Sequence, residues 1–191
     1  MIATNDSLST FCNFDNTPLP DTFEIQPHIY VTCLNAYIYG EPHGLWIDAT
    51  QKVEKIIMQI FRMLAANPVR GPRVYLIQTY NGFQGVKIEK YGDIEDVHKK
   101  ALFVSEHGEL GAKLISYYWG GFEDAQEALD QNYIGEYKNE LDYAIEFFNE
   151  SYNLSPKVQA YIDYESFKND LFIDDCFSIK VEGKSHIFSR Y

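Results

Sequence analysis

Residues 123–175 hold half of the carboxylates of this 191-residue chain, and tyrosines and phenylalanines lie between them at the spacing of a folded protein. The stretch contains fourteen Asp and Glu residues against three lysines, so it carries a net charge of −11 out of −12 for the chain. Disordered acidic segments contain few aromatic residues. The stretch is therefore predicted to fold, with its aromatic residues packed inside and a strongly acidic surface outside.

The bulk composition is that of a folded acidic protein. The chain is 46% hydrophobic and 16% aromatic, which is enough to bury a sizeable core in one domain or in a few small ones. Its net charge of −12 and pI near 4.7 argue against nucleic acid as a ligand, because binding requires cations that replace the counterions around phosphate. An acidic surface instead fits a basic protein partner.

Cysteine usage and the apolar pattern predict a cytoplasmic protein. The three cysteines, Cys12, Cys33 and Cys176, are widely spaced and form no CxxC pair, so we expect reduced thiols. The N-terminal sequence fits neither a signal nor a transit peptide, since aspartates and prolines interrupt its apolar residues. No apolar run approaches the roughly 20 residues that a membrane span needs, so no membrane contact is expected.

Before Tyr91 the sequence predicts a small sheet covered by one helix. β-branched and aromatic residues favour strands, whereas apolar residues three and four positions apart favour a helix. We expect an arm over 1–27, a strand over 28–39, a helix over 50–66 that begins at a Thr50 cap, and strands over 73–79 and 86–89 around a turn at 81–85. Core positions are assigned to Leu45, Trp46 and Ile47, and on the helix to Val53, Ile56, Ile57, Ile60, Phe61 and Leu64.

After Tyr91 the pattern is mainly helical. Glycines and prolines separate the apolar stripes, and Asp93 is placed to cap the first helix. The buried stripe of that helix is assigned to Ile94, Val97, Ala101 and Leu102. Helices are expected over 93–108, 110–118, 123–131, 139–152 and 164–171, with a short one after Pro156 and a closing hairpin over 176–181 and 186–189. These elements together predict an α+β fold.

Sequence patterns that mark catalysis are weak. None of the five histidines pairs with another at a spacing that zinc sites favour, and the glycines of the 81–85 turn lack the Lys-Ser or Lys-Thr of a phosphate loop. Cys33 or Cys176 paired with His43 or His186 is a minor alternative, because cysteines in strands are usually small core hydrophobes. A divalent-metal hydrolase is another, built on Asp163, Asp170, Asp174 and Asp175.

The acidic residues of the predicted 139–152 helix are spaced so that they repel one another. Asp142, Glu146 and Glu150 follow at i, i+4 without an interposed lysine. Like charges at that spacing destabilise a helix by roughly 0.2–0.5 kcal/mol per pair. A surface selected only for solubility mixes both signs. The helix therefore indicates that the negative field is used, either to steer a basic partner or to imitate a polyanion.

Four blocks of the sequence, in order, resemble the ArdA antirestriction proteins. They are 29–47 (IYVTCLNAYIYGEPHGLWI), 80–91 (YNGFQGVKIEKY), 128–144 (ALDQNYIGEYKNELDYA) and 161–171 (YIDYESFKNDL). The third block is similar to the antirestriction motif of that family, with the motif residues Ala128, Leu129, Tyr133, Gly135, Tyr137, Tyr143 and Ala144. In structural terms Gly135 is interpreted as a turn that ends a helix, and the tyrosines as core or dimer contacts.

The resemblance implies a DNA mimic, with no catalysis and no cofactor. Proteins of this family inhibit type I restriction-modification enzymes by occupying the DNA-binding groove of the methyltransferase core. The implied molecule is an elongated, curved homodimer with carboxylates spaced like DNA phosphates. Each chain would consist of the arm 1–27 and three small domains over 28–91, 92–132 and 133–191. The expected partner is thus the enzyme, and neither nucleic acid nor a membrane.

We assign the mimic charges to carboxylates of the acidic stretch. The twelve residues are Glu123, Asp124, Glu127, Asp130, Glu136, Glu140, Asp142, Glu146, Glu150, Asp163, Glu165 and Asp170. Around Tyr80, Thr79 and Asn81 replace two carboxylates of the family pattern, so the role of the first domain stays open. An acidic adaptor for another basic DNA-binding protein is the alternative function.

Overall fold

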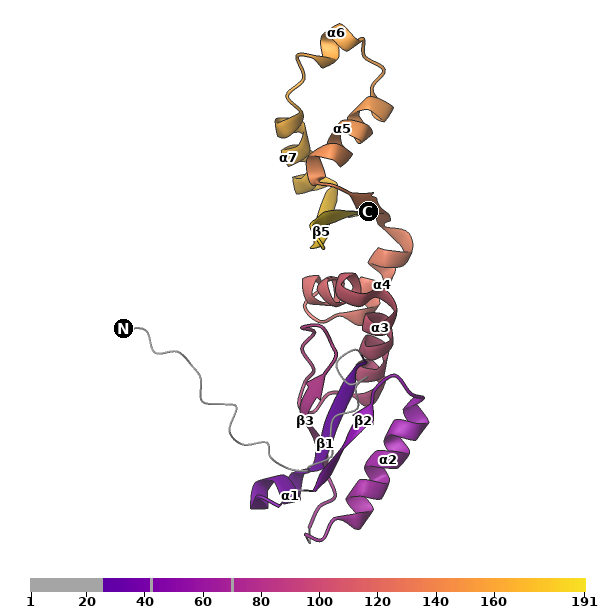
Figure 1. Ribbon diagram of the computed structural model, residues 1–191, viewed down its shortest axis with the longest axis vertical. Coiled ribbons are helices and arrows are strands. Elements are labelled where there is room, and N and C mark those ends of the chain that lie inside the picture. Colours follow the sequence, from indigo (N-terminus) through magenta and orange to yellow (C-terminus); the bar gives the residue numbers. More distant parts are fainter. Residues whose placement is uncertain (1–25, 42, 70) are drawn as a thin grey trace, which may run out of the picture.

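The computed structural model describes residues 26–41, 43–69 and 71–191 of the chain. Within this part, seven helices and two three-stranded antiparallel sheets follow one another along an elongated molecule (Figure 1). The predicted α+β class is confirmed. Apart from its last two residues, the predicted arm over 1–27 lies outside the described residues, and so does Cys12.

The first sheet and one helix form the N-terminal end. The sheet has the order β2-β1-β3 and consists of β1 (His28–Cys33), β2 (Gly44–Asp48) and β3 (Tyr75–Asn81). Helix α2 (Val53–Ala66) packs against β1 and β2. Of the core positions predicted in β2, Ile47 is buried and Leu45 is half-buried, whereas Trp46 is 37% exposed. Trp46 lies on the opposite face because successive strand residues alternate.

The strand predicted over 28–39 is wrong in its second half. β1 ends at Cys33, and the next residues form a short helix, α1 (Leu34–Tyr39). Gly40 ends this helix in a left-handed conformation with a φ of 72°, and its backbone N–H reaches two helix carbonyls. The two tyrosines of α1 are exposed. The glycine cap therefore overrides the strand preference of these aromatic residues.

Helix α2 begins three residues later than predicted, and Thr50 does not cap it. The Thr50 hydroxyl donates a hydrogen bond to Asp48 Oδ1 (2.6 Å) at the end of β2, while Lys52 holds the N-cap position. The predicted core residues Ile57 and Phe61 are exposed, because the sheet covers only one side of the wide apolar stripe. The buried residues of α2 are Ile56, Ile60, Met63 and Leu64.

The second predicted hairpin of the first half forms only in part. β3 begins two residues later than predicted, and the range 86–89 contains no strand. Val86 and Ile88 are buried between exposed neighbours, which is the alternation that predicted a strand. One backbone hydrogen bond, from Ile77 N–H to the Lys90 carbonyl (2.9 Å), links this segment to β3, and a single bond is too little for a ladder.

Helices α3 (Ile94–Tyr117) and α4 (Phe122–Gln131) connect the two sheets. The two helices predicted over 93–108 and 110–118 form the single bent helix α3, with the bend at Gly108, whose φ of 57° and ψ of −138° are not helical. Asp93 holds the N-cap position, but its side chain makes no capping hydrogen bond. Leu102, predicted to be buried, is 43% exposed because its neighbours Ala101 and Phe103 occupy the inner face.

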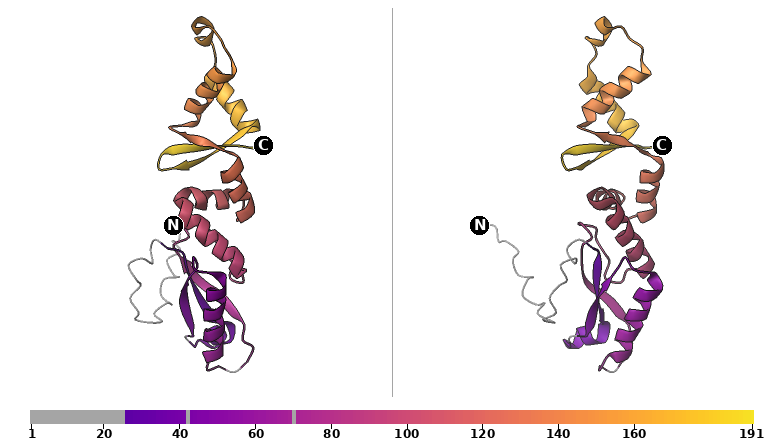
Figure 2. Two further views of the ribbon diagram at one scale, coloured as in Figure 1. Left: turned by 90° about the vertical axis from the view of Figure 1, so that its right-hand side faces the viewer. Right: turned by 45° about the vertical axis from the view of Figure 1, so that its right-hand side comes forward.

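The second sheet and three helices form the C-terminal end, as Figure 2 shows. The strand order is β4-β6-β5, with β4 (Tyr133–Tyr137), β5 (Cys176–Val181) and β6 (Lys184–Ser189). The helices are α5 (Glu140–Ser151), α6 (Pro156–Gln159) and α7 (Tyr164–Asp174). The predicted hairpin is confirmed, but β4 was missed: Gly135 pairs with Ile187 in the ladder and does not end a helix.

One hydrophobic core runs through most of the molecule. Buried residues of the first sheet, α2, α3 and α4 are continuous with Phe177, Ile179 and Phe188 of the second sheet. The Tyr117 ring, at the end of α3, stacks on Phe177 with the ring centroids 4.4 Å apart, and Phe177 stacks on Phe188 at 5.0 Å. We call Tyr117, Phe177 and Phe188 the aromatic junction. It attaches the second sheet to α3, while the division into three domains stays a prediction.

Replacing Phe177 by alanine should lower the free energy of unfolding by about 3–5 kcal/mol, because a buried ring is lost from the junction. Urea denaturation would measure the change. Phe147→Ala is the matched control: this ring lies on α5, away from the junction, and its residue is 38% exposed. The control should cost clearly less, and equal losses would contradict the central place of the junction.

Candidate functional site

The twelve carboxylates assigned from the sequence lie on four elements of the C-terminal half. We call them the acidic surface. They are Glu123, Asp124, Glu127 and Asp130 on α4, Glu136 on β4, Glu140, Asp142, Glu146 and Glu150 on α5, and Asp163, Glu165 and Asp170 at the N-cap and within α7. All except Glu140 are exposed. Regular secondary structure therefore holds nearly all of these charges in water.

On α4, small buried residues leave the carboxylates on the outer side. Ala125 and Ala128 are buried against α3, and the four acidic residues of the helix occupy exposed positions. Glu123 forms an ion pair with Lys99 of α3 (3.0 Å), and this hydrogen bond lowers the pKa of Glu123. Carboxylates in the first turn also interact favourably with the helix dipole. The α4 charges are thus attached to the rigid centre of the molecule.

On α5, the acidic residues form a ridge opposite an aromatic face. Asn139 caps the helix by accepting a hydrogen bond from the Asp142 N–H (2.9 Å), and Tyr143 and Phe148 are buried on the inner side. Glu146 accepts a hydrogen bond from the Tyr137 hydroxyl (2.9 Å). Burial first, and then this bond, raise the pKa of Tyr137. The predicted i, i+4 series is therefore exposed, and no cation of the described residues pairs with it.

On α7, the carboxylates have individual structural roles. Asp163 caps the helix, accepting from the Ser166 N–H (3.0 Å) and the Ser166 hydroxyl (2.8 Å), and these bonds lower the pKa of Asp163. Glu165 pairs with Lys168 one turn later (2.5 Å). Asp170 is exposed and has no ion pair within the described part of the chain. Of the three, Asp170 is the one most available to a partner.

Glu136 on β4 is partly neutralised by the neighbouring strand. Lys184 forms an ion pair with it, and His186 Nε2 lies 3.9 Å from its second oxygen. The hydrogen bond from Lys184 lowers the pKa of Glu136. Burial lowers the pKa of His186, against the opposing effect of Glu136. His186 Nδ1 is hydrogen-bonded to the Tyr133 hydroxyl (2.9 Å), so this histidine has a structural role.

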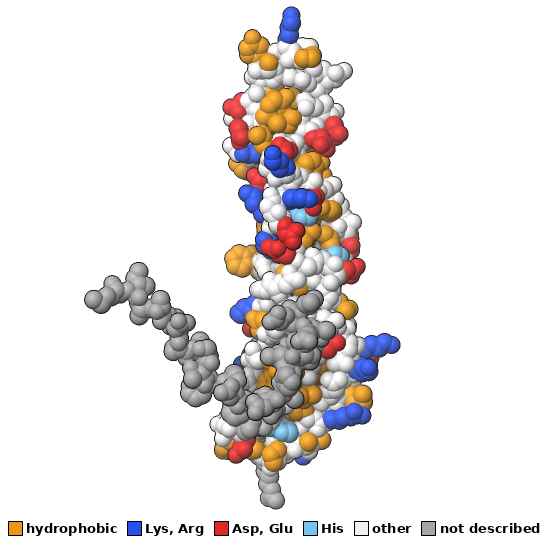
Figure 3. Space-filling model, viewed as in Figure 1, with side chains coloured by type: hydrophobic (Ala, Val, Ile, Leu, Met, Phe, Trp, Pro, Cys, Tyr) orange, Lys and Arg blue, Asp and Glu red, His pale blue; other side chains and the backbone are white. Residues whose placement is uncertain are grey.

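Most of the acidic surface lacks a cationic partner. Among the described residues, Glu123, Glu136 and Glu165 are the members of the twelve that form ion pairs. Glu140 is half-buried and accepts a hydrogen bond from the Ser178 hydroxyl (2.6 Å), which ties α5 to β5. On the face seen in Figure 3, acidic side chains extend from the end with α6 to the middle, with lysines and arginines among them. The negative charge is distributed and does not form one patch.

The antirestriction motif residues pack between α4, β4 and α5. Ala128 and Ala144 are buried, and Leu129 is half-buried. Tyr143 is buried, with its hydroxyl 3.8 Å from Cys176 Sγ. The Tyr133 ring stacks on His186 and packs at a tilt against Phe188. Tyr137 packs edge-on against Tyr143, and a Cβ at Gly135 would lie 3.4 Å from the Tyr137 ring. The motif therefore builds the support of the acidic surface.

The aspartates of the hydrolase alternative do not converge. Asp163 begins α7 and Asp174 ends it, so about 16 Å of helix separates them at 1.5 Å per residue. In the described part of the chain, no three His, Cys, Asp or Glu side chains are placed to hold a metal ion. The described residues therefore give the hydrolase alternative no support.

The described cysteines and histidines are used structurally. Cys33 and Cys176 are buried free thiols, and burial raises the pKa of Cys176, which disfavours a reactive thiolate. His43 Nε2 lies 2.6 Å from the Met63 carbonyl oxygen, and His98 Nδ1 lies 2.9 Å from that of Ala49. These contacts do not support a Cys/His nucleophile.

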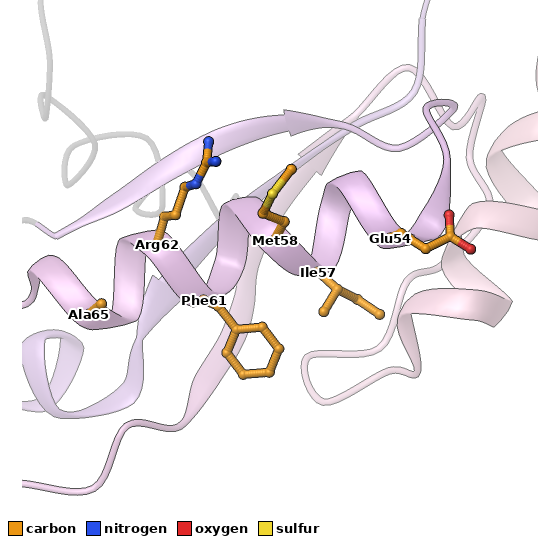
Figure 4. Close-up of a pocket in the computed structure, with 6 residues that line it drawn as sticks. All are labelled: Glu54, Ile57, Met58, Phe61, Arg62 and Ala65. Atoms are coloured by element: carbon orange, nitrogen blue, oxygen red, sulfur yellow. The ribbon is translucent and has the colours of Figure 1, made fainter.

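A shallow hollow lies along the outer side of α2. Its lining includes Ile57, Met58 and Phe61, with Glu54 and Arg62 at its edges (Figure 4). The side chains come from one helix face and bring no set of polar groups together, so the hollow has the character of an exposed apolar face.

No described helix is long and apolar enough to cross a membrane.

Comparison with protein families shows which family the chain belongs to. The family model described as "Antirestriction protein (ArdA)" matches residues 29–184, which is most of the chain. The chain belongs to the ArdA antirestriction protein family. Membership in ArdA implies an antirestriction function directed at restriction-modification enzymes, and inhibition in place of catalysis. No curated protein matches the chain.

Replacing Lys184 by methionine should raise the pKa of Glu136 toward its ordinary value, because its hydrogen-bonded cation is lost. With Lys184 present, Glu136 stays negative to a lower pH than in the variant. An NMR titration of the Glu136 side-chain carboxyl carbon measures this. Lys157→Met, which removes an exposed lysine from α6, should leave the Glu136 pKa unchanged. An unchanged pKa in K184M would show that the pair does not persist in solution.

Proposed function

We propose that this ArdA protein is a DNA mimic that occupies the DNA-binding groove of type I restriction-modification enzymes. The observation that carries the proposal is the acidic surface: eleven of its twelve carboxylates are exposed, and ion pairs within the described residues involve three of them. Exposed and unpaired charge is available to a cationic groove. The proposed site residues are these twelve, with the motif residues as their support.

The charge density is of the right order for mimicry. Duplex DNA presents about one charge per 1.7 Å of helix axis, so twelve carboxylates match about 20 Å of duplex. All 28 Asp and Glu residues of the chain would match about 48 Å.

We further propose a homodimer, which doubles both lengths of duplex that the carboxylates match. Sedimentation equilibrium at micromolar concentration should give the mass of two chains, and a single-chain mass would contradict the dimer.

The described elements distribute this charge unevenly. Residues 28–91 contain seven Lys and Arg against four Asp and Glu, so the first sheet and α2 are not acidic. The stretch 123–175 carries the negative charge instead. We therefore propose that the C-terminal half makes the main electrostatic contacts with the enzyme.

The proposed mechanism is competition driven by Coulomb attraction. A DNA-binding groove is lined with lysines and arginines that normally replace the counterions of phosphate. Carboxylates held on α4, α5 and α7 would meet the same cations, and long-range attraction would speed their encounter. A groove filled in this way excludes DNA, which blocks both modification and restriction.

Competition with DNA tests the mechanism directly. The purified chain, titrated into a type I methyltransferase bound to labelled target duplex, should displace the duplex at low salt and less well at high salt. Salt weakens the attraction between exposed charges. Displacement that does not depend on salt would contradict the electrostatic mechanism. No displacement at stoichiometric excess would favour the acidic adaptor as the function.

Removing the charged ridge of α5 should weaken binding with little change in stability. The triple variant Asp142→Asn, Glu146→Gln and Glu150→Gln should bind the methyltransferase about tenfold more weakly, as measured by titration calorimetry. It also removes two repulsive i, i+4 pairs, which together cost about 0.4–1 kcal/mol. Because it loses the first-turn charge of Asp142 and the charged acceptor of the Tyr137 hydroxyl as well, its free energy of unfolding should change by less than about 1 kcal/mol.

The matched control for this triple variant lies in the N-terminal half. Glu41→Gln, Glu54→Gln and Glu89→Gln together change the net charge equally, but they lie outside the acidic surface. This control should bind within about threefold of the unmodified chain. Equal weakening by both triple variants would mean that net charge matters and its placement does not.

A further inference from the structure

Trp119 lies in the turn between α3 and α4, at the middle of the molecule (Figure 1), and its side chain has no visible role in the fold. The residue is 98% exposed, more than any other large hydrophobic residue of the described chain. Among the described residues, its indole takes part in no ring stacking and no cation–π contact. Hydrophobic burial therefore does not explain a tryptophan here.

The backbone of Trp119 adds a cost to this exposure. Its φ is +56°, in the left-handed region that glycine adopts freely and that bulky residues adopt with strain. The turn is well defined: the Trp119 N–H bonds the Ser116 carbonyl (3.2 Å), and the Gly120 N–H bonds the Ile115 carbonyl (2.7 Å). This is a helix-ending turn in which the left-handed position is usually glycine. The chain places glycine one residue later and tryptophan at the strained position.

The surroundings of Trp119 indicate what its indole would bind. Glu123 and Asp124 follow within the first turn of α4 and belong to the acidic surface. A negative neighbourhood attracts cations and repels phosphate. The faces of tryptophan are the best cation–π acceptors among side chains. The chain's own nearby cations already have rings, since Lys99 lies over Phe122 and Arg190 over Phe177.

We infer that Trp119 is an anchor for the protein partner, and that its indole receives an arginine or lysine side chain from the cationic groove. This inference rests on the proposed function, because it takes the partner to be that enzyme. Asp124, which forms no ion pair within the described residues, would contact a cation that normally contacts a phosphate. The indole offers a guanidinium or ammonium group an aromatic face, which a carboxylate lacks. The hydrogen bonds of the turn fix the backbone at Trp119, so little backbone conformational entropy is lost on binding.

Binding by the methyltransferase core, measured by calorimetry with the full chain, tests the anchor. Trp119→Ala should bind about 30-fold more weakly, the loss typical of an aromatic interface anchor. Trp119→Phe should retain most of the affinity, whereas Trp119→Leu should lose as much as alanine, because leucine is apolar but has no π face. Tyr39→Ala, which removes a ring that is 71% exposed on α1, is the control and should bind normally.

Stability measurements test whether Trp119 has a structural role. Trp119→Gly should raise the melting temperature by about 2–4 °C, because glycine relieves the strain at positive φ and little packing is lost. The same variant should bind as weakly as Trp119→Ala. A lower melting temperature of Trp119→Gly would show that the ring supports the fold and would overturn the inference.

The outcomes separate the anchor from the proposed function. If the unmodified chain displaces DNA and Trp119→Ala displaces it equally well, the anchor is wrong and the mimicry stands. If Trp119→Leu binds normally while Trp119→Ala does not, the contact is apolar and the cation–π assignment is wrong. If the unmodified chain does not bind the methyltransferase, both proposals fail.

Discussion

The aromatic junction between α3 and the second sheet is the contact on which the shape of the molecule depends. Helices and sheets that follow one another along an elongated molecule make few contacts with distant elements. The contact between each pair of neighbouring elements therefore has to be rigid by itself. Tyr117, Phe177 and Phe188 stack in series, and the Arg190 guanidinium lies over Phe177 while donating hydrogen bonds to the Tyr117 hydroxyl and the Cys176 carbonyl. The junction thereby fixes the charges of α5 and α7 relative to those of α4. The proposed mimicry of a duplex surface requires such fixed spacing.

In residues 123–175, the packing of aromatic side chains offsets the repulsion between the many carboxylates. On α5, the Phe148 ring packs against Tyr164 and Phe167 with ring centroids 5.4 Å and 5.0 Å apart. Burying a phenylalanine contributes about 1.5–3 kcal/mol, whereas a like-charged pair on a helix costs about 0.2–0.5 kcal/mol. One buried ring thus outweighs several repulsive pairs. The acidic ridge and the strained, exposed Trp119 are both places where the chain forgoes stability that a purely structural sequence would keep.

Periodicity predicted the helices well and the strands less well. Helices α4, α5 and α7 lie close to their predicted ranges because their starts are marked in the sequence: Gly121 precedes α4, and the side chains of Asn139 and Asp163 cap α5 and α7. β4 was missed, since its tyrosines and glycine acquire strand structure by pairing with β6, which is 50 residues away in the chain. The 28–39 strand was overextended because its aromatic residues have high strand propensity, and their exposure was invisible in the sequence. A partner strand distant in sequence decides the first case, and the Gly40 cap decides the second.

The sequence alone determined three things about this protein: the α+β class, the concentration of charge in 123–175 and the resemblance to ArdA. Composition, periodicity and motif order can be read directly from the linear chain. The twelve carboxylates could also be chosen from it, since charged residues without partners nearly always stay in water. Tertiary structure was needed to show that Glu123, Glu136 and Glu165 are paired, that Glu140 braces α5 against β5, and that the motif supports the surface. It also revealed the exposed, strained Trp119. Pairing, burial and backbone strain depend on which residues meet in space, and a linear pattern does not contain that information.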